Sequence, residues 1–242
     1  MVSKIKNIVL GAGQVANAIK NNLLTAPLVF DRGEWEKTHL KSEILHVTIP
    51  YSDDFERIII KAIYNFDPEI IIIHSTVKPG TTEKLGKNVL FSPVLGRHSD
   101  EFSNNIQMYQ KFFAGDPDCY EQVRHEFQLN SEFWGTNTGE LEYSKIMSTT
   151  RMYWELLFTK SLEKDCKKNG YDFKQVHHRW TDNYNAGIRL KHPKWERTIY
   201  SMMDSDLPGG HCLRPNIHLV DNEITNYIKA YEKEILYIVS KG

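Results

Sequence analysis

Short apolar runs alternate with amphipathic stretches over the first half of the chain. Runs of Ile, Val, Leu and Phe bounded by polar or turn residues predict buried β-strands, whereas apolar residues three or four positions apart predict helices. Alternation of the two patterns is typical of a parallel sheet with helices on both faces. The predicted strands are Ile5–Leu10, Ala26–Phe30, Glu43–Ile49, Glu69–His74, Val89–Ser92 and Lys111–Ala114, and the predicted helices lie near Asn17–Leu24, Phe55–Asn65 and Cys119–Phe127.

A purely helical pattern follows from about residue 137. From Gly139 the apolar residues keep helical spacing until Asn169-Gly170, which predicts one helix of about thirty residues. Such a helix alone would leave an apolar stripe uncovered, so we expect a homodimer. Further helices are predicted at Phe173–Tyr184 and Asp221–Val239. The sequence thus predicts an α/β protein, with a doubly wound, mostly parallel sheet in residues 1–136 and an all-helical domain with one long central helix in residues 137–242.

The turn after the first predicted strand carries two glycines and opens directly into a helical pattern. Gly11 suits a tight turn, Gly13 lets backbone N–H groups approach a phosphate, and Ala16 is small enough for the helix to lie close on the strand. The N-terminus of that helix favours an anion. We therefore expect this junction, together with Gln14 and Val15, to bind the pyrophosphate of a dinucleotide in a Rossmann-type domain.

The second predicted strand ends in an acidic residue, Asp31, about twenty residues beyond the glycines, where a carboxylate can hold an adenosine ribose. That carboxylate would repel a 2′-phosphate, which favours NAD as cofactor, while the adjacent Arg32 leaves NADP as the alternative. An ordinary strand-to-helix turn with Asp31 as a turn residue or cap is the competing interpretation. Pro50 and Ser75 follow later strands and are further cofactor-binding candidates, because loops at the carboxyl ends of parallel strands face the ligand.

Composition narrows the class of protein. The 242 residues are 40% hydrophobic and 25% charged, enough for one large domain or two modest ones, and a net charge of −1 argues against a nucleic-acid partner. Three dispersed cysteines indicate a reducing, cytoplasmic compartment rather than a disulfide framework. No apolar run is long enough to span a membrane. The histidines lack metal-ligand spacing, so we expect no metal.

Two further places carry candidate chemistry. The loop His74–Thr82 offers hydroxyl groups and backbone amides to a cofactor or substrate, although a Pro-Gly turn with a threonine helix cap would explain it equally well. In Gly209-Gly210-His211-Cys212, the glycines permit close approach of a ligand and a protonated His211 would lower the pKa of the Cys212 thiol. A buried, inert cysteine is the alternative. Lys145 in the long helix can polarise a carbonyl or lie in solvent.

These places together resemble the UDP-glucose/GDP-mannose dehydrogenase family of the 6-phosphogluconate dehydrogenase-like group. The resemblance implies that hydride passes from an alcohol carbon to NAD and that Cys212 captures the aldehyde as a thiohemiacetal and then a thioester. It also implies that Lys145 stabilises oxyanions and that Thr76 positions water or cofactor. The substrate would contact Thr149, Gly209, Gly210 and His211. The similar segments are Gly11–Ala16, Ser75–Thr82, Glu142–Lys145 and Gly209–Leu213.

The sequence departs from that family at several points. Val94 follows Ser-Pro where the family has a glutamate active in thioester hydrolysis, and Thr149 replaces an asparagine one turn after the lysine. The family's carboxyl-terminal nucleotide-sugar domain has no counterpart before Gly242. Only about a dozen residues separate Asp31 from the strand at Glu43–Ile49, which leaves little room for another strand and helix.

Three hypotheses follow. The first is an NAD-dependent dehydrogenase that oxidises an alcohol of a sugar-like or other small substrate. The second is a non-catalytic NAD-binding module, which the missing carboxylate at Val94 favours. The third is a reductase of a small keto or imine compound that uses Lys145, with Cys212 only structural. Replacing Cys212 by Ser distinguishes the first from the third.

Overall fold

The computed structural model describes residues 4–31, 33–96, 106–129, 131–135, 137–200 and 209–239. The chain divides into two compact units, Met1–Ile146 and Met147–Gly242. The first contains the whole β-sheet and the start of the long helix, and the second is helical within its described residues. Within the described ranges, no helix is both long and apolar enough to cross a bilayer.

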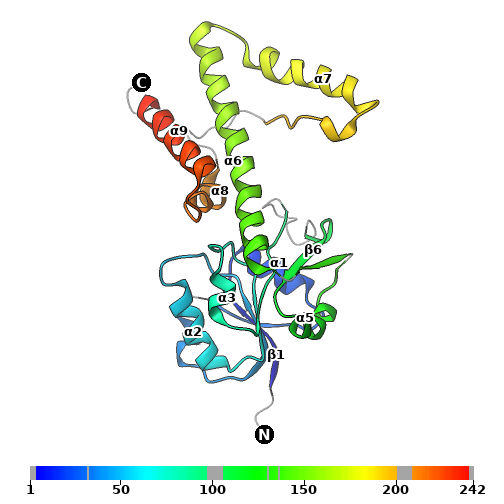
Figure 1. The fold of residues 1–242 in the computed structure, drawn as a ribbon, viewed down its shortest axis with the longest axis vertical. Helices are drawn as coiled ribbons and strands as arrows, with labels where there is room; N and C mark the ends of the chain where they lie inside the picture. Colours follow the sequence, from blue (N-terminus) through cyan, green and yellow to red (C-terminus); the bar gives the residue numbers. More distant parts are fainter. Residues whose placement is uncertain are drawn as a thin grey trace. The chain divides into compact units, whose positions relative to one another are not determined.

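The first unit is built on a seven-stranded sheet in the order β2-β1-β3-β4-β5-β6-β7 (Figure 1). All neighbouring strands run parallel except β5 and β6, which are antiparallel. The structure thus confirms the predicted mostly parallel sheet, and each of the six predicted strands is present. The strands are β1 (Ile5–Leu10), β2 (Leu28–Phe30), β3 (Ser42–Val47), β4 (Ile70–Ile73), β5 (Val89–Phe91), β6 (Lys111–Ala114) and β7 (Glu132–Gly135).

Helices cover both faces of this sheet. One apolar cluster joins α1 and α5 to the sheet, and a second joins α2 and α3 to its other face. The fold is therefore doubly wound, as predicted. Among the described residues between β2 and β3, the regular structure is one short 3-10 helix, so the limited room expected there is confirmed. These elements are α1 (Gln14–Asn22), η1 (Glu34–Lys37), α2 (Phe55–Phe66), α3 (Thr81–Leu85), α5 (Pro117–Val123) and η2 (Arg124–Glu126).

The long predicted helix is α6, Thr138–Asn169, with 32 residues. Its first turns belong to the first unit and the remainder to the second. The second unit has a small core, built by α6, α8 and α9 around Tyr153 and Leu157. The predicted helix at 173–184 extends to Arg189 through a π-helical start. The further elements are η3 (Lys174–Arg179), α7 (Trp180–Arg189), η4 (Pro193–Trp195), α8 (Gly210–Asn216) and α9 (Glu223–Val239).

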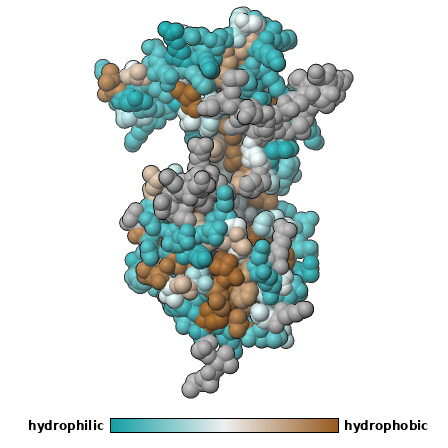
Figure 2. All heavy atoms as spheres, turned by 180° about the vertical axis from the view of Figure 1, so that it is seen from behind, coloured by the Kyte–Doolittle hydropathy of each residue, from teal (hydrophilic) through white to brown (hydrophobic). Residues whose placement is uncertain are grey.

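Hydrophobic residues are exposed on both units, as the space-filling view shows (Figure 2). On the first unit, the side chain of Ile60 in α2 is 61% exposed. On the second, Phe158 in α6 is 54% exposed and Trp180 in α7 is 72% exposed.

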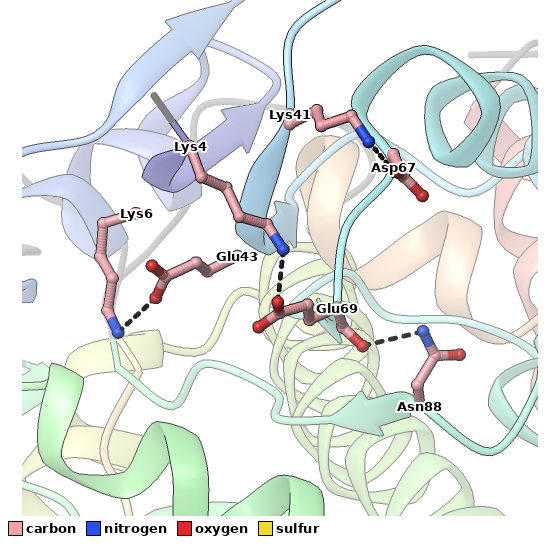
Figure 3. Close-up of polar contacts among 7 residues, drawn as sticks. All are labelled: Lys4, Lys6, Lys41, Glu43, Asp67, Glu69 and Asn88. Carbon is pink, nitrogen blue, oxygen red and sulfur yellow. Dashed lines mark hydrogen bonds and ion pairs between the residues drawn. The ribbon is translucent and has the colours of Figure 1, made fainter. Parts of the chain in front are cut away.

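The amino ends of the strands are joined by exposed polar contacts (Figure 3). Lys4 before β1 pairs with Glu69 before β4, and the Glu69 carbonyl accepts a hydrogen bond of 3.0 Å from Asn88 Nδ2 before β5. Water screens such exposed pairs, so they stabilise the fold little. The cofactor-binding candidates Gly11, Asp31 and Ser75 follow the carboxyl ends of β1, β2 and β4, at the opposite edge of the sheet. The other ion pairs in this view are Lys6 with Glu43 at 2.7 Å and Lys41 with Asp67 at 2.8 Å.

Candidate dinucleotide and substrate site

The junction between β1 and α1 requires a glycine at position 11. Gly11 has φ +115°, and a Cβ built there would lie 2.6 Å from Thr48 Oγ1 after β3. Its N–H donates to the Phe30 carbonyl of β2 at 2.8 Å. The turn therefore brings the ends of β1, β2 and β3 together at the point where α1 begins.

Gly13 is different, because its backbone is ordinary and its surroundings are open. It is the N-cap of α1 with φ −79°, and no side chain provides a capping hydrogen bond. A Cβ built on Gly13 would meet no atom within 4 Å. Gln14 is exposed, Val15 is half-buried against the first apolar cluster, and Ala16 is buried. A helix N-terminus that faces open space offers backbone N–H groups to a phosphate, so the residues present fit a pyrophosphate.

The end of β2 carries two carboxylates rather than one. Asp31 is exposed directly after the strand, and its N–H donates to Glu34 Oε2 at 2.9 Å. Sequence reasoning missed Glu34, although it lies three residues after Asp31 in an acidic segment. Arg32, on which the NADP alternative depended, lies outside the described residues. Pro50 is exposed shortly after β3.

The loop after β4 is held from both sides. Ser75 is buried, and its Oγ donates to the Ile49 carbonyl at 2.6 Å, which ties this loop to the end of β3. Thr76 is half-buried, and its side chain makes no hydrogen bond to the part of the chain that the structure describes. The threonine helix cap considered from the sequence is wrong: the N-cap of α3 is Gly80, with φ +87° and no side-chain capping bond.

Glu142 of α6 performs the capping role instead. Its carboxylate accepts hydrogen bonds from Gly80 N–H at 2.5 Å, Thr82 N–H at 2.9 Å and Thr82 Oγ1 at 2.6 Å. Burial raises the pKa of Glu142, and the three hydrogen bonds oppose that shift. Sequence reasoning quoted Glu142 only as a neighbour of the lysine. Its side chain fixes the loop before α3 against the first turns of α6.

Lys145 lies one helical turn beyond Glu142 and reaches the end of β5. Its Nζ donates to the Val94 carbonyl at 2.8 Å. The Val94 side chain is buried in the first apolar cluster. Position 94 therefore presents a backbone oxygen to the lysine, and its side chain faces the core.

A buried polar chain crosses the sheet beside this point, and sequence reasoning missed most of it. Asn7, His46 and Lys111 lie in β1, β3 and β6, and His74 directly follows β4, all at most 4% exposed. His46 Nδ1 lies 3.1 Å from His74 Nε2, and Lys111 Nζ lies 2.7 Å from the Ser92 carbonyl. Burial lowers the pKa of all three titratable groups, that of His46 to about 3. A polar residue inside an otherwise apolar strand was the signal that could have revealed them.

The candidate residues after position 147 lie in the second unit. Cys212 is half-buried in the first turn of α8, a helix that the sequence analysis did not predict. Gly209 has φ +100°, and a Cβ there would lie 2.7 Å from two ring carbons of Tyr153. Packing against Tyr153 thus explains this glycine without a substrate. Gly210 is exposed, and the side chain of His211 lies outside what the structure describes.

Thr149 is half-buried on α6 and contacts α8. Its Oγ1 accepts a hydrogen bond from Asn216 Nδ2 at 3.2 Å. The contact fixes α8 on α6 and uses an oxygen that the sequence had suggested for substrate. Of the other two cysteines, Cys166 is buried and Cys119 packs against the first apolar cluster.

Comparison with known proteins shows a shared fold without close sequence relatives. No protein-family model and no curated protein matches this sequence. A UDP-glucose dehydrogenase from Pyrobaculum islandicum superposes with a TM-score of 0.64 at 14% identity, over 98% of this chain and 68% of that one. The 3-hydroxyisobutyrate dehydrogenase from Mycobacterium tuberculosis, solved with L-serine, has a TM-score of 0.62 at 12% identity, over 96% of this chain and 94% of that one.

A third structure, Psf3 in complex with NADP+ and 2-OPP, has a TM-score of 0.56 at 13% identity, over 94% of this chain and 93% of that one. The sheet followed by a long helix is thus an arrangement that these proteins share with this chain. At such identities the likeness shows the fold alone.

Proposed function

We propose that this protein is an NAD-dependent dehydrogenase that oxidises an alcohol carbon of a small, sugar-like substrate. The observation that carries the proposal is the open N-terminus of α1, with Gly13 as an uncapped N-cap next to the tight turn at Gly11. In this proposal residues 1–136 are the dinucleotide-binding domain and residues 137–242 form the helical substrate and dimerisation domain. The fold of the dehydrogenases above supports it.

Binding of the dinucleotide uses backbone groups at one end and carboxylates at the other. The N–H groups of Gln14 and Val15 would contact the pyrophosphate. Asp31 would accept hydrogen bonds from the adenosine ribose, and Glu34, whose carboxylate accepts from the Asp31 N–H, adds negative charge there. Two carboxylates disfavour a 2′-phosphate, which supports NAD over NADP. A dinucleotide held by these residues would supply the hydride acceptor for the substrate alcohol.

The chain's own residues would position the substrate and stabilise its alkoxide, while the hydroxyl proton would pass to solvent water. Lys145, held at the Val94 carbonyl, would stabilise an alkoxide through its ammonium group. The half-buried Thr76 hydroxyl would orient water or cofactor. Cys212 would attack the aldehyde, with Thr149, Gly209, Gly210 and His211 contacting substrate; these assignments rest on the family resemblance.

Calorimetric titration with NAD+ tests the proposal, and Gly13→Asp sharpens it. Aspartate is a good N-cap, and its Cβ would meet nothing within 4 Å, so we expect the variant to fold with an unchanged or higher melting temperature. Its carboxylate would occupy the phosphate position, so NAD+ affinity should fall by at least about tenfold. The matched control, Gly187→Ala in α7, also meets open space and should leave binding unchanged.

The wild-type titration decides the outcome. Absence of NAD+ and NADP+ binding would overturn the dehydrogenase proposal and its cofactor-binding alternatives. If the affinity for NAD+ is unchanged in Gly13→Asp, the dinucleotide does not bind at the N-terminus of α1. A preference for NADP+ would overturn the role given to Asp31 and Glu34.

Replacement of the cysteine separates covalent from non-covalent chemistry. If Cys212 captures an aldehyde, Cys212→Ser should reduce four-electron oxidation by on the order of a hundredfold or more. Cys166→Ser is the control, because that thiol is buried in the second unit. Steady-state NADH production with UDP-glucose and with 3-hydroxyisobutyrate gives the readout. Unchanged turnover in Cys212→Ser would favour a reductase that uses Lys145 alone.

One observation favours a second candidate function, a non-catalytic NAD-binding module. Val94 stands where the resembled family has a catalytic glutamate, and its side chain packs in the apolar cluster. No carboxylate is therefore available at this position to activate water for thioester hydrolysis. NAD+ binding without hydride transfer to any of a panel of sugar alcohols and hydroxy acids would support this candidate.

A further inference from the structure

The polar chain across the sheet runs between two backbone carbonyls. Asn7 Nδ2 donates to the Thr25 carbonyl at 3.1 Å, and Asn7 Oδ1 lies 3.1 Å from His46 Nε2. His46 Nδ1 faces His74 Nε2 at 3.1 Å, and His74 Nδ1 lies 2.7 Å from the Ser92 carbonyl. This series of side chains therefore has a hydrogen-bond acceptor, a backbone carbonyl, at each end.

These hydrogen-bonded contacts need one more hydrogen than the neutral side chains supply. The Asn7 amide supplies the hydrogen for the Thr25 carbonyl and accepts at its other end, so three contacts remain: Asn7 with His46, His46 with His74, and His74 with the Ser92 carbonyl. Each contact needs one hydrogen between its two atoms. Two neutral imidazoles provide only two. With both rings neutral, the bare His74 Nδ1 would face the Ser92 oxygen with a lone pair on each atom.

Lys111 stands where the missing proton is needed. Its Nζ donates to the carbonyls of Ser92 at 2.7 Å and Pro93 at 3.2 Å, and lies 3.4 Å from His74 Nδ1. An ammonium on Lys111 can donate toward His74 Nδ1 and the Ser92 oxygen together. If the proton moves, the N–H bond at Lys111 breaks, one forms at His74 Nδ1, and the charge passes from amine to imidazole.

The surroundings allow one positive charge but disfavour two. On one side the Phe127 ring packs edge-on against both imidazoles, and Lys111 Nζ lies 5.7 Å from the centroid of the Phe113 ring. Carbonyl oxygens and the ring face can stabilise a single cation. A second charge 3.4 Å away would be repelled in a poorly solvated site. Lys145 of α6 is not part of this hydrogen-bonded series, and its positive charge repels a positive charge on Lys111.

We infer that His74 and Lys111 share one proton, and that this proton fixes the turn Ser92–Val94 beside Lys145. The three consecutive carbonyls of this turn then accept from two lysines, Ser92 and Pro93 from Lys111 and Val94 from Lys145. His74 and Lys111 are thereby positioning residues for Lys145. This positioning role rests on the proposed dehydrogenase function, whereas the sharing of the proton does not.

Nitrogen-15 NMR of histidine-labelled wild-type protein tests the sharing directly. We expect His46 to carry its hydrogen on Nε2 with Nδ1 bare, and His74 to be protonated on Nε2. The His74 Nδ1 signal should lie between the limits of a bare and a protonated nitrogen, without titrating between about pH 6 and 8. A His74 Nδ1 signal at either limit would overturn the inference.

The variant Lys111→Met removes the amine that is inferred to share the proton with His74. We expect the His74 Nδ1 signal to move to one of the two limits and to titrate, while Lys87→Met, at an exposed lysine of the same unit, changes nothing. If Lys111→Met does not fold, the wild-type spectrum still decides. An unchanged His74 signal in a folded Lys111→Met would contradict the sharing.

The positioning role has its own readout. In Lys111→Met, kcat should fall by about tenfold or more and its pH profile should shift, while the KM for NAD+ stays unchanged. A fall in NAD+ affinity with an unchanged pH profile would indicate a merely structural lysine. If wild-type protein binds no dinucleotide, the proposed function fails and the NMR result stands by itself.

Discussion

Glu142 is a single buried carboxylate that satisfies three donors of another segment, and its replacement should have a measurable cost. Glu142→Ala leaves Gly80 N–H, Thr82 N–H and the Thr82 hydroxyl without their acceptor. We expect the free energy of unfolding to fall by about 3 kcal/mol. Denaturant unfolding measures it, with the exposed Glu140→Ala on the same helix as control. A loss no greater than that of the control would contradict the prediction.

The raised pKa of Glu142 also predicts a pH dependence. Because the folded protein binds this proton more tightly than the unfolded chain, Glu142 makes stability decline as pH rises from its ordinary pKa of 4.5 through its raised one. Glu142→Gln lacks that slope. The stability advantage of the wild type over Glu142→Gln should therefore narrow from about pH 4 to pH 7. A widening gap would show that ionisation of Glu142 stabilises the fold.

Sequence reasoning at the scale of residues succeeded where a local pattern carries the chemistry. The backbone requirement at Gly11 and the place of Asp31 after β2 follow from spacing within one strand–turn–helix segment. His46 and Lys111 were missed because their partners lie on other strands, and no spacing along the chain records such a contact. Glu142 was missed as a cap because its partners precede it by some sixty residues.

At the scale of elements, the start of α8 depends on Gly209 packing against Tyr153 of α6. In Gly209→Ala the new Cβ would meet the buried ring at 2.7 Å, in a backbone conformation with positive φ. We expect a loss of about 2–4 kcal/mol in stability. Gly210→Ala is the matched control, since its Cβ meets nothing within 4 Å, and should cost about 1 kcal/mol. Thermal unfolding compares the two.

A rescue experiment distinguishes the clash from backbone strain. Replacing Tyr153 by Leu in the Gly209→Ala background should recover part of the loss, because the smaller side chain leaves room for the Cβ. Equal effects of Gly209→Ala and Gly210→Ala would show that Tyr153 does not constrain the start of the helix.

The sequence predicted strongly apolar elements and missed those of mixed composition. Six strands and the long helix follow from apolar runs or helical spacing, and β2 was predicted from its apolar run although none of its three side chains is fully buried. β7, Glu132–Gly135, has four residues and no fully buried side chain, so its pattern carries no clear period. α8 begins with two glycines and contains Pro215, residues that normally interrupt helices. Its position is set by tertiary contacts from Tyr153 and Thr149.

At the scale of the whole molecule, exposed apolar side chains on α6 support the proposed homodimer. Phe158 is 54% exposed and Met152 is 42% exposed. We expect a dimer in sedimentation at micromolar concentration, and Phe158→Glu should shift it toward monomer. Ile60→Glu on α2, which replaces an equally exposed apolar residue, is the control. A monomeric wild type would contradict the dimer. Equal effects of Phe158→Glu and Ile60→Glu would show that Phe158 does not lie in the dimer interface.

The doubly wound sheet followed by helices was predictable because it depends on the order of patterns along the chain. The identity of the substrate leaves no such pattern, because it depends on which surface groups meet the ligand. The structural neighbours act on different compounds, a nucleotide sugar for one and a hydroxy acid for another, while sharing this fold.

The two roles of residue 94 limit how this protein can be re-engineered. Its carbonyl serves Lys145 and its side chain fills the apolar cluster. Val94→Glu would therefore place a carboxylate in the apolar cluster and lower the stability of the fold by several kcal/mol. The carboxylate could avoid this only if the segment rotated, which would break the hydrogen bond from Lys145. An acid at position 94 demands compensating changes around it, and Val94→Glu alone should yield an unstable protein rather than one with an added general base.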